Sequence, residues 1–327
     1  MSAVPEASRL DPAVYPHARL RGLIERAQRA GSERRAGGGR PVRVAVVHPC
    51  DALAVDAAQR MATLGIAEPV LVGDPDAIRA AGAASDVDAA AFEIVPSGPS
   101  GAEAAARATA LVHAGGADAL MKGSLHTDEL MSAVVDRATG LRGERRISHA
   151  FLFDLPRYPK LLALADCVVN IAPNLAAKRS ILGNAIELLQ TLGIAEPKVG
   201  VVAAVETVNP AIPATLDAAE LARLGREGAW PGAIVDGPFG FDNAISAESA
   251  RIKKISSPVP GDADLLLMPD LNAGNMLYKS FVYIGGGDCA GLVLGARVPV
   301  VLTSRADSLQ SRIASVALAG LAARAPA

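Results

Sequence analysis

Residues 264–308 of this 327-residue chain read DLLLMPDLNAGNMLYKSFVYIGGGDCAGLVLGARVPVVLTSRADS. Two apolar runs in this stretch, residues 265–268 and 298–303, have the length of buried strands, and each leads into small and polar residues. In an open α/β sheet, the carboxyl ends of parallel strands meet the amino ends of the following helices, and ligands bind there. The stretch therefore predicts an enzyme with an anion-binding site at two strand ends.

From residue 41 onward, the rest of the chain alternates short apolar runs with helical segments. Such alternation is typical of the α/β class, in which helices cover both faces of a mainly parallel sheet. Further strands are predicted at residues 42–47, 69–72, 92–95, 117–121, 148–153, 167–171, 199–205 and 233–235. Helices are predicted at residues 52–64, 75–81, 101–114, 127–136, 175–192, 216–226 and 309–324.

The length and one short repeat suggest two similarly built layers. A chain of 327 residues with 50% hydrophobic positions is long enough for two domains, each an α/β/α sandwich. The hexapeptide LGIAEP occurs at residues 64–69 and again at 192–197, each time between a predicted helix and a strand. Glycine there supplies a left-handed turn and proline blocks the helix from continuing.

Charge and cysteine content exclude several classes of protein. The formal net charge of -2 shows no bias toward nucleic acid or an anionic membrane surface. Three widely spaced cysteines, Cys50, Cys167 and Cys289, predict neither a disulfide framework nor a zinc knuckle. The first residues lack a secretory signal pattern, and no apolar run approaches the length of a membrane span. We therefore expect a soluble, cytoplasmic protein that binds anions locally.

Residues 1–40 are predicted to form an N-terminal, arginine-rich helical extension. A helix over residues 15–30 would place Leu20, Leu23, Ile24 and Ala27 on one face, and the glycines at 37–39 would end it. Its arginines could hold nucleic acid. Acidic residues dilute their charge, however, so a solvated helix that packs on the outside of the protein is the favoured interpretation.

The segment after the predicted strand at residues 117–121 could hold phosphate. Lys122, Ser124 and His126 surround a flexible glycine at the start of a helix, where backbone N–H groups and the ammonium could bind an anion. The spacing is not that of a Walker A loop, which argues against ordinary nucleoside triphosphate chemistry. Alternatively, Ser124 or Thr127 only caps the helix.

Two further strand ends carry candidate substrate-binding residues. Asp236, with Asp242 six residues later, could act as a base or bind a metal, although both also suit a turn and a helix cap. Asp270, Asn272 and Asn275 could bind a hydroxyl or an amide of a ligand. In the alternative interpretation, Asn272 caps the helix.

Ser304 and Arg305 are the candidates whose side chains best suit the binding of an anion. Arginine supplies permanently charged, planar donors for phosphate or carboxylate, and a neighbouring serine can hydrogen-bond a developing anion. Asp307 would cap the last helix or orient Arg305. The basic loop at residues 137–146 could anchor the phosphates of a large cofactor or be a solvated surface loop, and both interpretations stay open.

Several motifs resemble those of the phosphate acetyltransferase and phosphate butyryltransferase family, and are closer to its butyryltransferase branch. The resemblance covers roughly residues 41–320 and follows the family's order of motifs. It rests on LMKGSLHT, RRISHAFLFD, DCVVNIAPNLAAKRSILGNAIEL, PKVGVVAAVETVNPAIPAT, AIVDGPFGFDNAISAESA, KISSPVPGDADLLLMPDLNAGNMLYKS and VPVVLTSRADS.

The resemblance implies reversible transfer of a short acyl group, acetyl or butyryl, between coenzyme A and inorganic phosphate. It also implies the two-domain fold of isocitrate and isopropylmalate dehydrogenases. The first domain would comprise residues 41–146 and 291–327 and the second residues 147–290, with the active-site cleft between them. The coenzyme A thioester would be a substrate, with no permanently bound cofactor and no metal, and the enzyme would be a homodimer or higher homo-oligomer.

The resemblance also assigns roles at the last strand end. Ser304 and Arg305 match a catalytic serine and arginine of the acetyltransferase branch. That branch has an acidic residue, proposed as a base, seven positions after the serine, where this chain has Ser311. Asp307 is our substitute prediction for that base.

Two other functions remain open at this point. A nicotinamide-dependent decarboxylating dehydrogenase would share the fold, but no Gly-x-Gly-x-x-Gly follows the first strand. A non-catalytic regulator that binds acyl-CoA or acyl phosphate would explain Ser311. The acyl-chain length does not follow from residue types, because separate segments would form the pocket wall.

Overall fold

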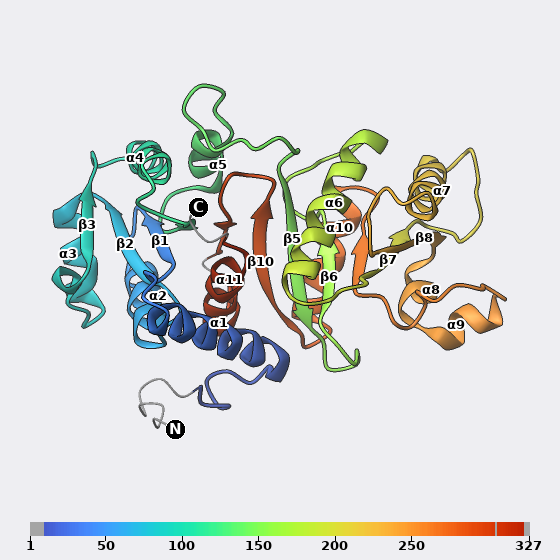
Figure 1. The fold of residues 1–327 in the computed structure, drawn as a ribbon, viewed down its shortest axis with the longest axis horizontal. Coiled ribbons are helices and arrows are strands. Elements are labelled where there is room, and N and C mark those ends of the chain that lie inside the picture. The colour runs from blue at the N-terminus through green and yellow to red at the C-terminus, as the bar shows by residue number, and fades with distance from the viewer. Residues whose placement is uncertain (1–9, 305, 324–327) are drawn as a thin grey trace. The chain divides into compact units, whose positions relative to one another are not determined.

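The computed structural model describes residues 10–304 and 306–323, which form two compact α/β units (Figure 1). Unit 1 comprises Met1–Glu144 and Ala290–Ala327, and unit 2 comprises Arg145–Cys289. Strands in both units are mainly parallel, which confirms the predicted fold class.

The sheet of unit 1 has the strand order β3-β2-β1-β4-β11-β10. All neighbours in it are parallel except β10, which runs antiparallel to β11. Because helices cover them, the central strands are almost wholly buried and therefore almost wholly apolar. The strands are β1 (Arg43–Val47), β2 (Glu68–Gly73), β3 (Glu93–Pro96), β4 (Ala119–Lys122), β10 (Asp288–Leu294) and β11 (Val300–Val301).

Six α-helices of unit 1 are described, and the first of them is the arginine-rich helix. It packs against α11 and buries Leu20, Leu23, Ile24 and Ala27, which confirms the predicted apolar face. It begins three residues later and ends six residues later than predicted. The helices are α1 (Ala18–Ala36), α2 (Ala52–Thr63), α3 (Pro75–Ala84), α4 (Gly101–His113), α5 (Thr127–Val135) and α11 (Leu309–Ala322), with a 3-10 turn, η2 (Ala89–Ala91).

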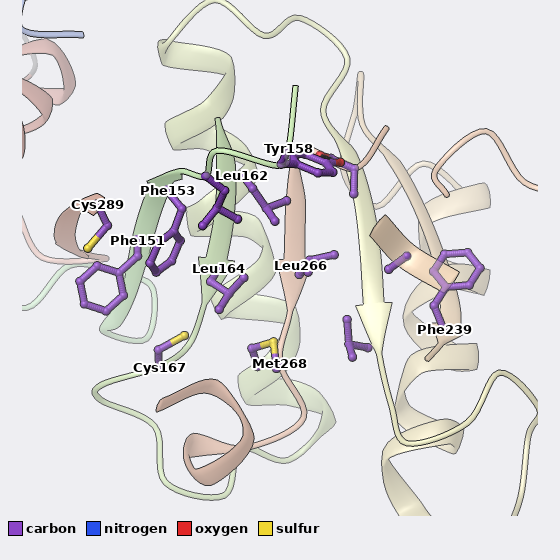
Figure 2. Close-up of a cluster of buried hydrophobic side chains, with 14 of the residues drawn as sticks. Phe151, Phe153, Tyr158, Leu162, Leu164, Cys167, Phe239, Leu266, Met268 and Cys289 are labelled. Carbon is purple, nitrogen blue, oxygen red and sulfur yellow. Dashed lines mark hydrogen bonds between the residues drawn. The ribbon is translucent and has the colours of Figure 1, made fainter. Parts of the chain in front are cut away.

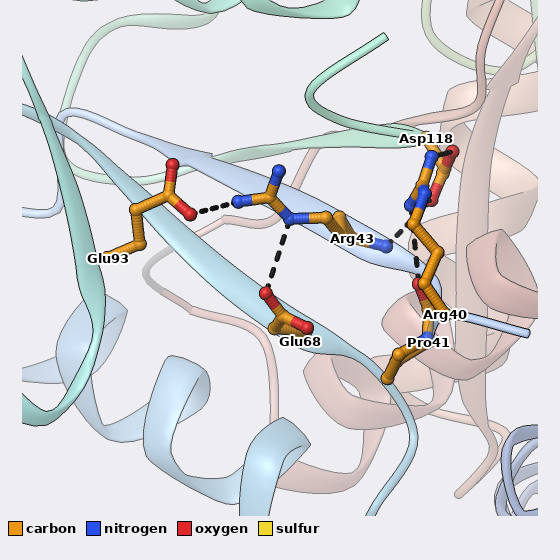
Figure 3. Close-up of polar contacts among 6 residues, drawn as sticks. All are labelled: Arg40, Pro41, Arg43, Glu68, Glu93 and Asp118. Carbon is orange, nitrogen blue, oxygen red and sulfur yellow. Dashed lines mark hydrogen bonds and ion pairs between the residues drawn. The ribbon is translucent and has the colours of Figure 1, made fainter. Parts of the chain in front are cut away.

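Charged side chains join the amino-terminal ends of the strands in unit 1 (Figure 3). Arg43, at the start of β1, pairs with Glu68 of β2 at 3.3 Å and with Glu93 of β3. Asp118 accepts a hydrogen bond from the Arg43 backbone N–H at 2.8 Å and holds both terminal nitrogens of Arg40. This network stabilises the end of the sheet at which the strands begin. The candidate site residues of unit 1 follow the opposite, carboxyl-terminal ends of the strands.

The sheet of unit 2 has the strand order β5-β6-β9-β7-β8. Only β5 and β6 are antiparallel. The strands are β5 (Ser148–Asp154), β6 (Leu162–Ala165), β7 (Lys198–Val202), β8 (Ile234–Phe239) and β9 (Leu265–Leu267). The helices are α6 (Leu175–Thr191), α7 (Pro213–Arg226), α8 (Phe241–Ile245), α9 (Ala247–Ile252) and α10 (Leu271–Tyr283).

Aromatic side chains of α10 pack on the buried apolar cluster of unit 2, which includes Phe151 and Phe153 (Figure 2). The ring of Tyr278 stacks on Phe151 with 4.4 Å between centroids, and Phe281 meets Phe153 edge to face at 5.2 Å. Aromatic pairs in these geometries stabilise packing beyond the area that they bury, by about 0.5–1.5 kcal/mol each. The start of α10, which carries several candidate residues, is therefore rigidly placed within its unit.

Several predicted strands differ from the structure. The strand predicted at residues 233–235 extends to Phe239 in β8. The run at residues 167–171 is a loop, and the strand lies just before it, at β6. The predicted strands at residues 199–205 and 298–303 shorten to β7 and to the two-residue β11. Both copies of LGIAEP form the predicted left-handed turn, with φ of +68° at Gly65 and +85° at Gly193. Among the described residues, no helix has the length and apolar character that a membrane span requires.

Candidate functional site

Three loops of unit 1 come together where β1, β4 and β11 end. The backbone O of His48 accepts hydrogen bonds from both the N–H and the Oγ of Ser124, at 2.9 and 2.8 Å. Ser124 Oγ in turn accepts from the backbone N–H of Cys50 at 2.8 Å. Thr303, which precedes Ser304, donates from its hydroxyl to the backbone O of Lys122 at 3.2 Å. The loops of Lys122 and Ser304 therefore lie side by side, as the parallel strand order predicts.

Gly123 makes this convergence possible, because a side chain there would collide with the neighbouring strand. A Cβ at this position would lie 2.5 Å from the backbone O of Val47 and 2.7 Å from that of His48. Neither backbone atom can move without separating β1 from β4. The loop of Lys122 thus requires glycine at its second position.

We expect Gly123→Ala to destabilise the protein by about 1–3 kcal/mol, because overpacking against backbone forces a shift of the strand ends. Denaturant unfolding of the variant measures this change. Gly22→Ala is the matched control, since a Cβ at Gly22 meets nothing within 4 Å and alanine favours the helix α1. Equal unfolding midpoints for Gly123→Ala and wild type would contradict the close approach.

The loop after β11 is ordered by its own acidic residue. Asp307 accepts a hydrogen bond from the backbone N–H of Ser304 at 2.6 Å, and Ser308, not Asp307, caps α11 by accepting from the N–H of Ser311 at 2.9 Å. The exposed Ser304 Oγ accepts from the N–H of Ala306 at 3.3 Å, and its own proton has no acceptor among the described residues. A hydroxyl donor is thereby presented at the strand end. Arg305 lies outside the described residues.

The other candidates of unit 1 differ in placement. Lys122 is half-buried and donates to the backbone O of Gly123 at 3.2 Å, so its ammonium stays beside the loop. His126 is exposed at the start of α5, where its backbone N–H donates to Glu129 at 2.8 Å. Ser311 is buried inside α11, only 5% exposed. The position where the resemblance implies a base therefore presents no side chain to solvent.

In unit 2, the loop that follows β6 is built around the buried carboxylate of Asp166. This carboxylate accepts hydrogen bonds from the backbone N–H groups of His149, Val168 and Val169, at 2.9 to 3.1 Å, and from Asn170 Nδ2 at 2.6 Å. Several N–H donors satisfy a buried carboxylate where a continuing strand would leave it unpaired. This is the physical reason why residues 167–171 form a loop.

Helix α10 begins directly on this loop. Asp270 is its N-cap and accepts from the N–H of Ala273 at 3.0 Å, so the alternative in which Asn272 caps the helix is wrong. Asn272 is exposed, while Asn275 donates from its amide to the backbone O of Cys167 at 3.2 Å. Asp270 and Asn275 therefore belong to one cluster with the Asp166 loop, and their predicted contact with substrate stays a prediction.

Gly274 lets α10 approach the Asp166 loop. A Cβ there would lie 2.5 Å from the backbone O of Asp166 and 3.1 Å from the sulfur of Cys167. We expect Gly274→Ala to destabilise the protein by about 1–3 kcal/mol, as measured by denaturant unfolding. Gly183→Ala in α6 is the control, because its nearest neighbour lies at an ordinary 3.4 Å. A Gly274→Ala protein as stable as Gly183→Ala would show that the helix tolerates a wider spacing.

His149 is buried beneath this loop, only 1% exposed, with its ring 4.4 Å from that of Phe151. Neither ring nitrogen has a hydrogen-bond partner. Burial lowers the pKa of His149 to about 4, against the opposing attraction of Asp166. The imidazole is therefore neutral at physiological pH.

Asp236 does not join the cluster at α10. It lies within β8, where its carboxylate accepts from the N–H of Gly237 at 2.9 Å and faces Arg226 of α7 at 3.7 Å. Ser249 donates to Asp242 at 2.5 Å, and this hydrogen bond lowers the pKa of Asp242, which makes it a weaker base. Within residues 10–304 and 306–323, no three His, Cys, Asp or Glu side chains gather closely enough to hold a metal.

Sequence reasoning missed three residues of these clusters: His48, Asp166 and Asn170. His48 directly follows a correctly predicted strand, and its position at a strand end could have marked it as a candidate site residue. Asp166 and Asn170 were hidden, since the apolar residues between them resemble a strand.

Comparisons with known proteins agree on one family. Residues 99–320 match the family described as phosphate acetyl/butaryl transferase. The chain is 49% identical over 281 residues to a phosphate acetyltransferase of Rhizobium meliloti, covering 86% of this chain and 89% of that protein. It is 38% identical to a phosphate butyryltransferase of Clostridium acetobutylicum, covering 86% and 93%. Relatives with either name match, so the identities confirm the family and do not select a branch.

A solved structure supports the same conclusion. The branched-chain phosphotransacylase of Enterococcus faecalis superimposes with a TM-score of 0.75 at 29% identity, covering 87% of this chain and 100% of that one. A family match over more than half of the chain, together with relatives 49% and 38% identical over 86% of the chain, shows the family. The chain therefore belongs to the phosphate acetyl/butaryl transferase family and is an acyltransferase.

Proposed function

We propose that the chain transfers a short acyl group, acetyl or butyryl, reversibly between coenzyme A and inorganic phosphate, giving acyl phosphate and free coenzyme A. The observation that carries this proposal is the convergence of the Lys122 and Ser304 loops at the ends of parallel strands in unit 1. The ammonium of Lys122 and the hydroxyl of Ser304 there suit an anionic nucleophile. Family membership supports the same reaction.

In the proposed reaction, phosphate itself is the nucleophile. One of its oxygens attacks the thioester carbonyl carbon, a tetrahedral oxyanion forms, and the carbon–sulfur bond breaks as the electron pair leaves on the coenzyme A sulfur. The protein must hold phosphate against the thioester and stabilise the developing negative charge. We assign phosphate to Lys122 and Arg305, and the oxyanion or the departing sulfur to the hydroxyl of Ser304. The hydroxyl of Ser124 donates to the backbone O of His48, so its predicted role in substrate binding becomes one of holding the Lys122 loop in place.

Asp307 is the proposed acceptor of any proton that phosphate loses. Its hydrogen bond to the Ser304 N–H also supports a second role, which is to hold the loop in shape. Burial raises the pKa of the thiols of Cys50 and Cys167, which disfavours the thiolate that a covalent acyl-cysteine would need. Direct transfer to phosphate is therefore the favoured route.

The proposal is tested by assaying thiol release from acetyl-, propionyl- and butyryl-CoA with and without phosphate. We expect release that depends on phosphate and yields acyl phosphate in equal amount. Comparison of kcat/KM among the three thioesters assigns the preferred acyl group. Tight binding of acyl-CoA without phosphate-dependent release would overturn the proposal in favour of a non-catalytic regulator, the function that Ser311 suggests.

We also propose that the enzyme is a cytoplasmic homodimer or higher homo-oligomer that keeps no bound cofactor. The family resemblance supports this assembly, and the coenzyme A thioester enters only as substrate. Light scattering during size-exclusion chromatography measures the assembly directly. A monomer at micromolar concentration would contradict it.

A further inference from the structure

One exposed arginine of unit 2 stands at the end of a buried chain of hydrogen bonds. The amide of Asn170, itself 3% exposed, donates from Nδ2 to Asp166 at 2.6 Å and to the backbone O of Ile147 at 3.0 Å. These two acceptors fix which way the amide points. Its oxygen therefore faces Arg146 and accepts from the Nε of that side chain at 2.5 Å.

The backbone of Arg146 is held as well. Its carbonyl O accepts from Nδ2 of the buried Asn184 at 2.9 Å, and the same amide nitrogen contacts Ser148 Oγ at 2.9 Å. Both the backbone and the root of the guanidinium are thus anchored by buried amides. Burying such polar groups costs free energy unless they are fully paired, so the anchor is a specific construction rather than an incidental surface contact.

This arrangement leaves the two terminal guanidinium nitrogens of Arg146 available to a ligand. Nε donates to a neutral amide oxygen, and no carboxylate pairs with the guanidinium in the described part of the chain. The four N–H donors on its two terminal nitrogens remain, in the planar fork that matches phosphate or carboxylate. The adjacent Arg145 differs, since it forms an ordinary exposed ion pair with Glu187.

We propose that Arg146 binds a phosphate group of the substrates, with Asn170 and Asp166 as positioning residues that aim its guanidinium. The proposal rests on the proposed acyl transfer and goes beyond it, because it gives unit 2 a phosphate-binding residue of its own. Two sources share this chemistry, inorganic phosphate and the phosphates of coenzyme A. Prearranged arginine loses less conformational entropy on binding than a free surface side chain, which is the advantage that the buried anchor supplies.

The test compares Arg146→Gln with Arg145→Gln, which removes the same charge one residue away. Loss of a charged, forked contact is expected to raise one KM on the order of 10- to 100-fold while kcat changes little. A higher KM for phosphate alone assigns inorganic phosphate. A higher KM for acyl-CoA indicates that Arg146 binds a phosphate of coenzyme A. In that case the variant should show no increase in KM with acyl-pantetheine, which lacks the nucleotide phosphates. Equal KM values for the two variants would overturn the proposal.

Two further variants test the positioning role. Asn170→Ala removes the acceptor for Nε and should raise the same KM as Arg146→Gln does, by a smaller factor. Arg146→Lys keeps the charge but loses the forked donors, so its increase in KM should also be smaller than that of Arg146→Gln. Thermal unfolding of each variant checks that the fold is retained. Calorimetric binding of coenzyme A and of inorganic phosphate to wild type and Arg146→Gln needs no turnover. It therefore tests Arg146 even if acyl transfer is absent, and unchanged affinities for both would overturn the inference.

Discussion

Replacing Ser304 with alanine is expected to lower kcat by about 100- to 1000-fold, which is the usual cost of removing one donor to a developing oxyanion. The Ser304 hydroxyl is exposed at the end of β11, and its proton has no acceptor among the described residues. A donor that is already presented in this way needs no rearrangement when charge develops. Because the backbone of Ser304 stays bonded to Asp307 in the variant, the loop should keep its shape.

The matched control is Ser308→Ala, four residues later in the same loop. Ser308 caps α11, so its loss should cost about 1 kcal/mol of stability and leave kcat nearly unchanged. Steady-state thiol release from butyryl-CoA and phosphate gives kcat for both variants, and thermal unfolding gives their stability. If Ser304→Ala turned over at the wild-type rate, the hydroxyl would have no part in the chemical step.

The strand-end loops of unit 1 were within reach of sequence analysis. Apolar runs marked β4 and β11, and the polar residues that follow them, from Lys122 and from Ser304, stood out by type alone. What could not be predicted was the pairing of β1 with β4, which brings the carbonyl of His48 to Ser124, 76 residues away. Strand neighbours are a property of the whole sheet, and no local pattern encodes them.

The Asp166 loop shows the opposite case, in which local pattern misled. Three of the five residues at 167–171 are β-branched, so the run has strand propensity. Its conformation is decided by a carboxylate that bonds to the N–H groups two and three residues later, and such side-chain bonds compete with strand pairing. A choice between two possible capping residues decided the start of α10. Asp270 and Asn272 are both good caps, and the end of β9 at Leu267 favours the earlier one.

Unit 2 is expected to lose stability as the pH falls from about 6.5 toward 4, because of His149. In the unfolded chain this imidazole titrates near its ordinary pKa of 6.5, whereas burial lowers its pKa in the folded protein to about 4. Between these values the unfolded chain binds a proton that the folded chain does not, so acid favours unfolding. The stabilisation is complete above pH 6.5, and its loss at pH 4 is on the order of 3 kcal/mol.

His149→Leu should abolish most of this acid sensitivity. Neither ring nitrogen has a partner, so an apolar side chain leaves no hydrogen-bonding group unpaired and should change stability little at pH 7.5. Trp230, the single tryptophan, lies in unit 2 and reports its denaturant unfolding by fluorescence at each pH. His126→Leu, which removes an exposed imidazole of unit 1, should keep the wild-type pH dependence. If His149→Leu lost stability between pH 6.5 and 4 as steeply as wild type, other groups would have to carry the acid response, and a buried neutral His149 would not explain it.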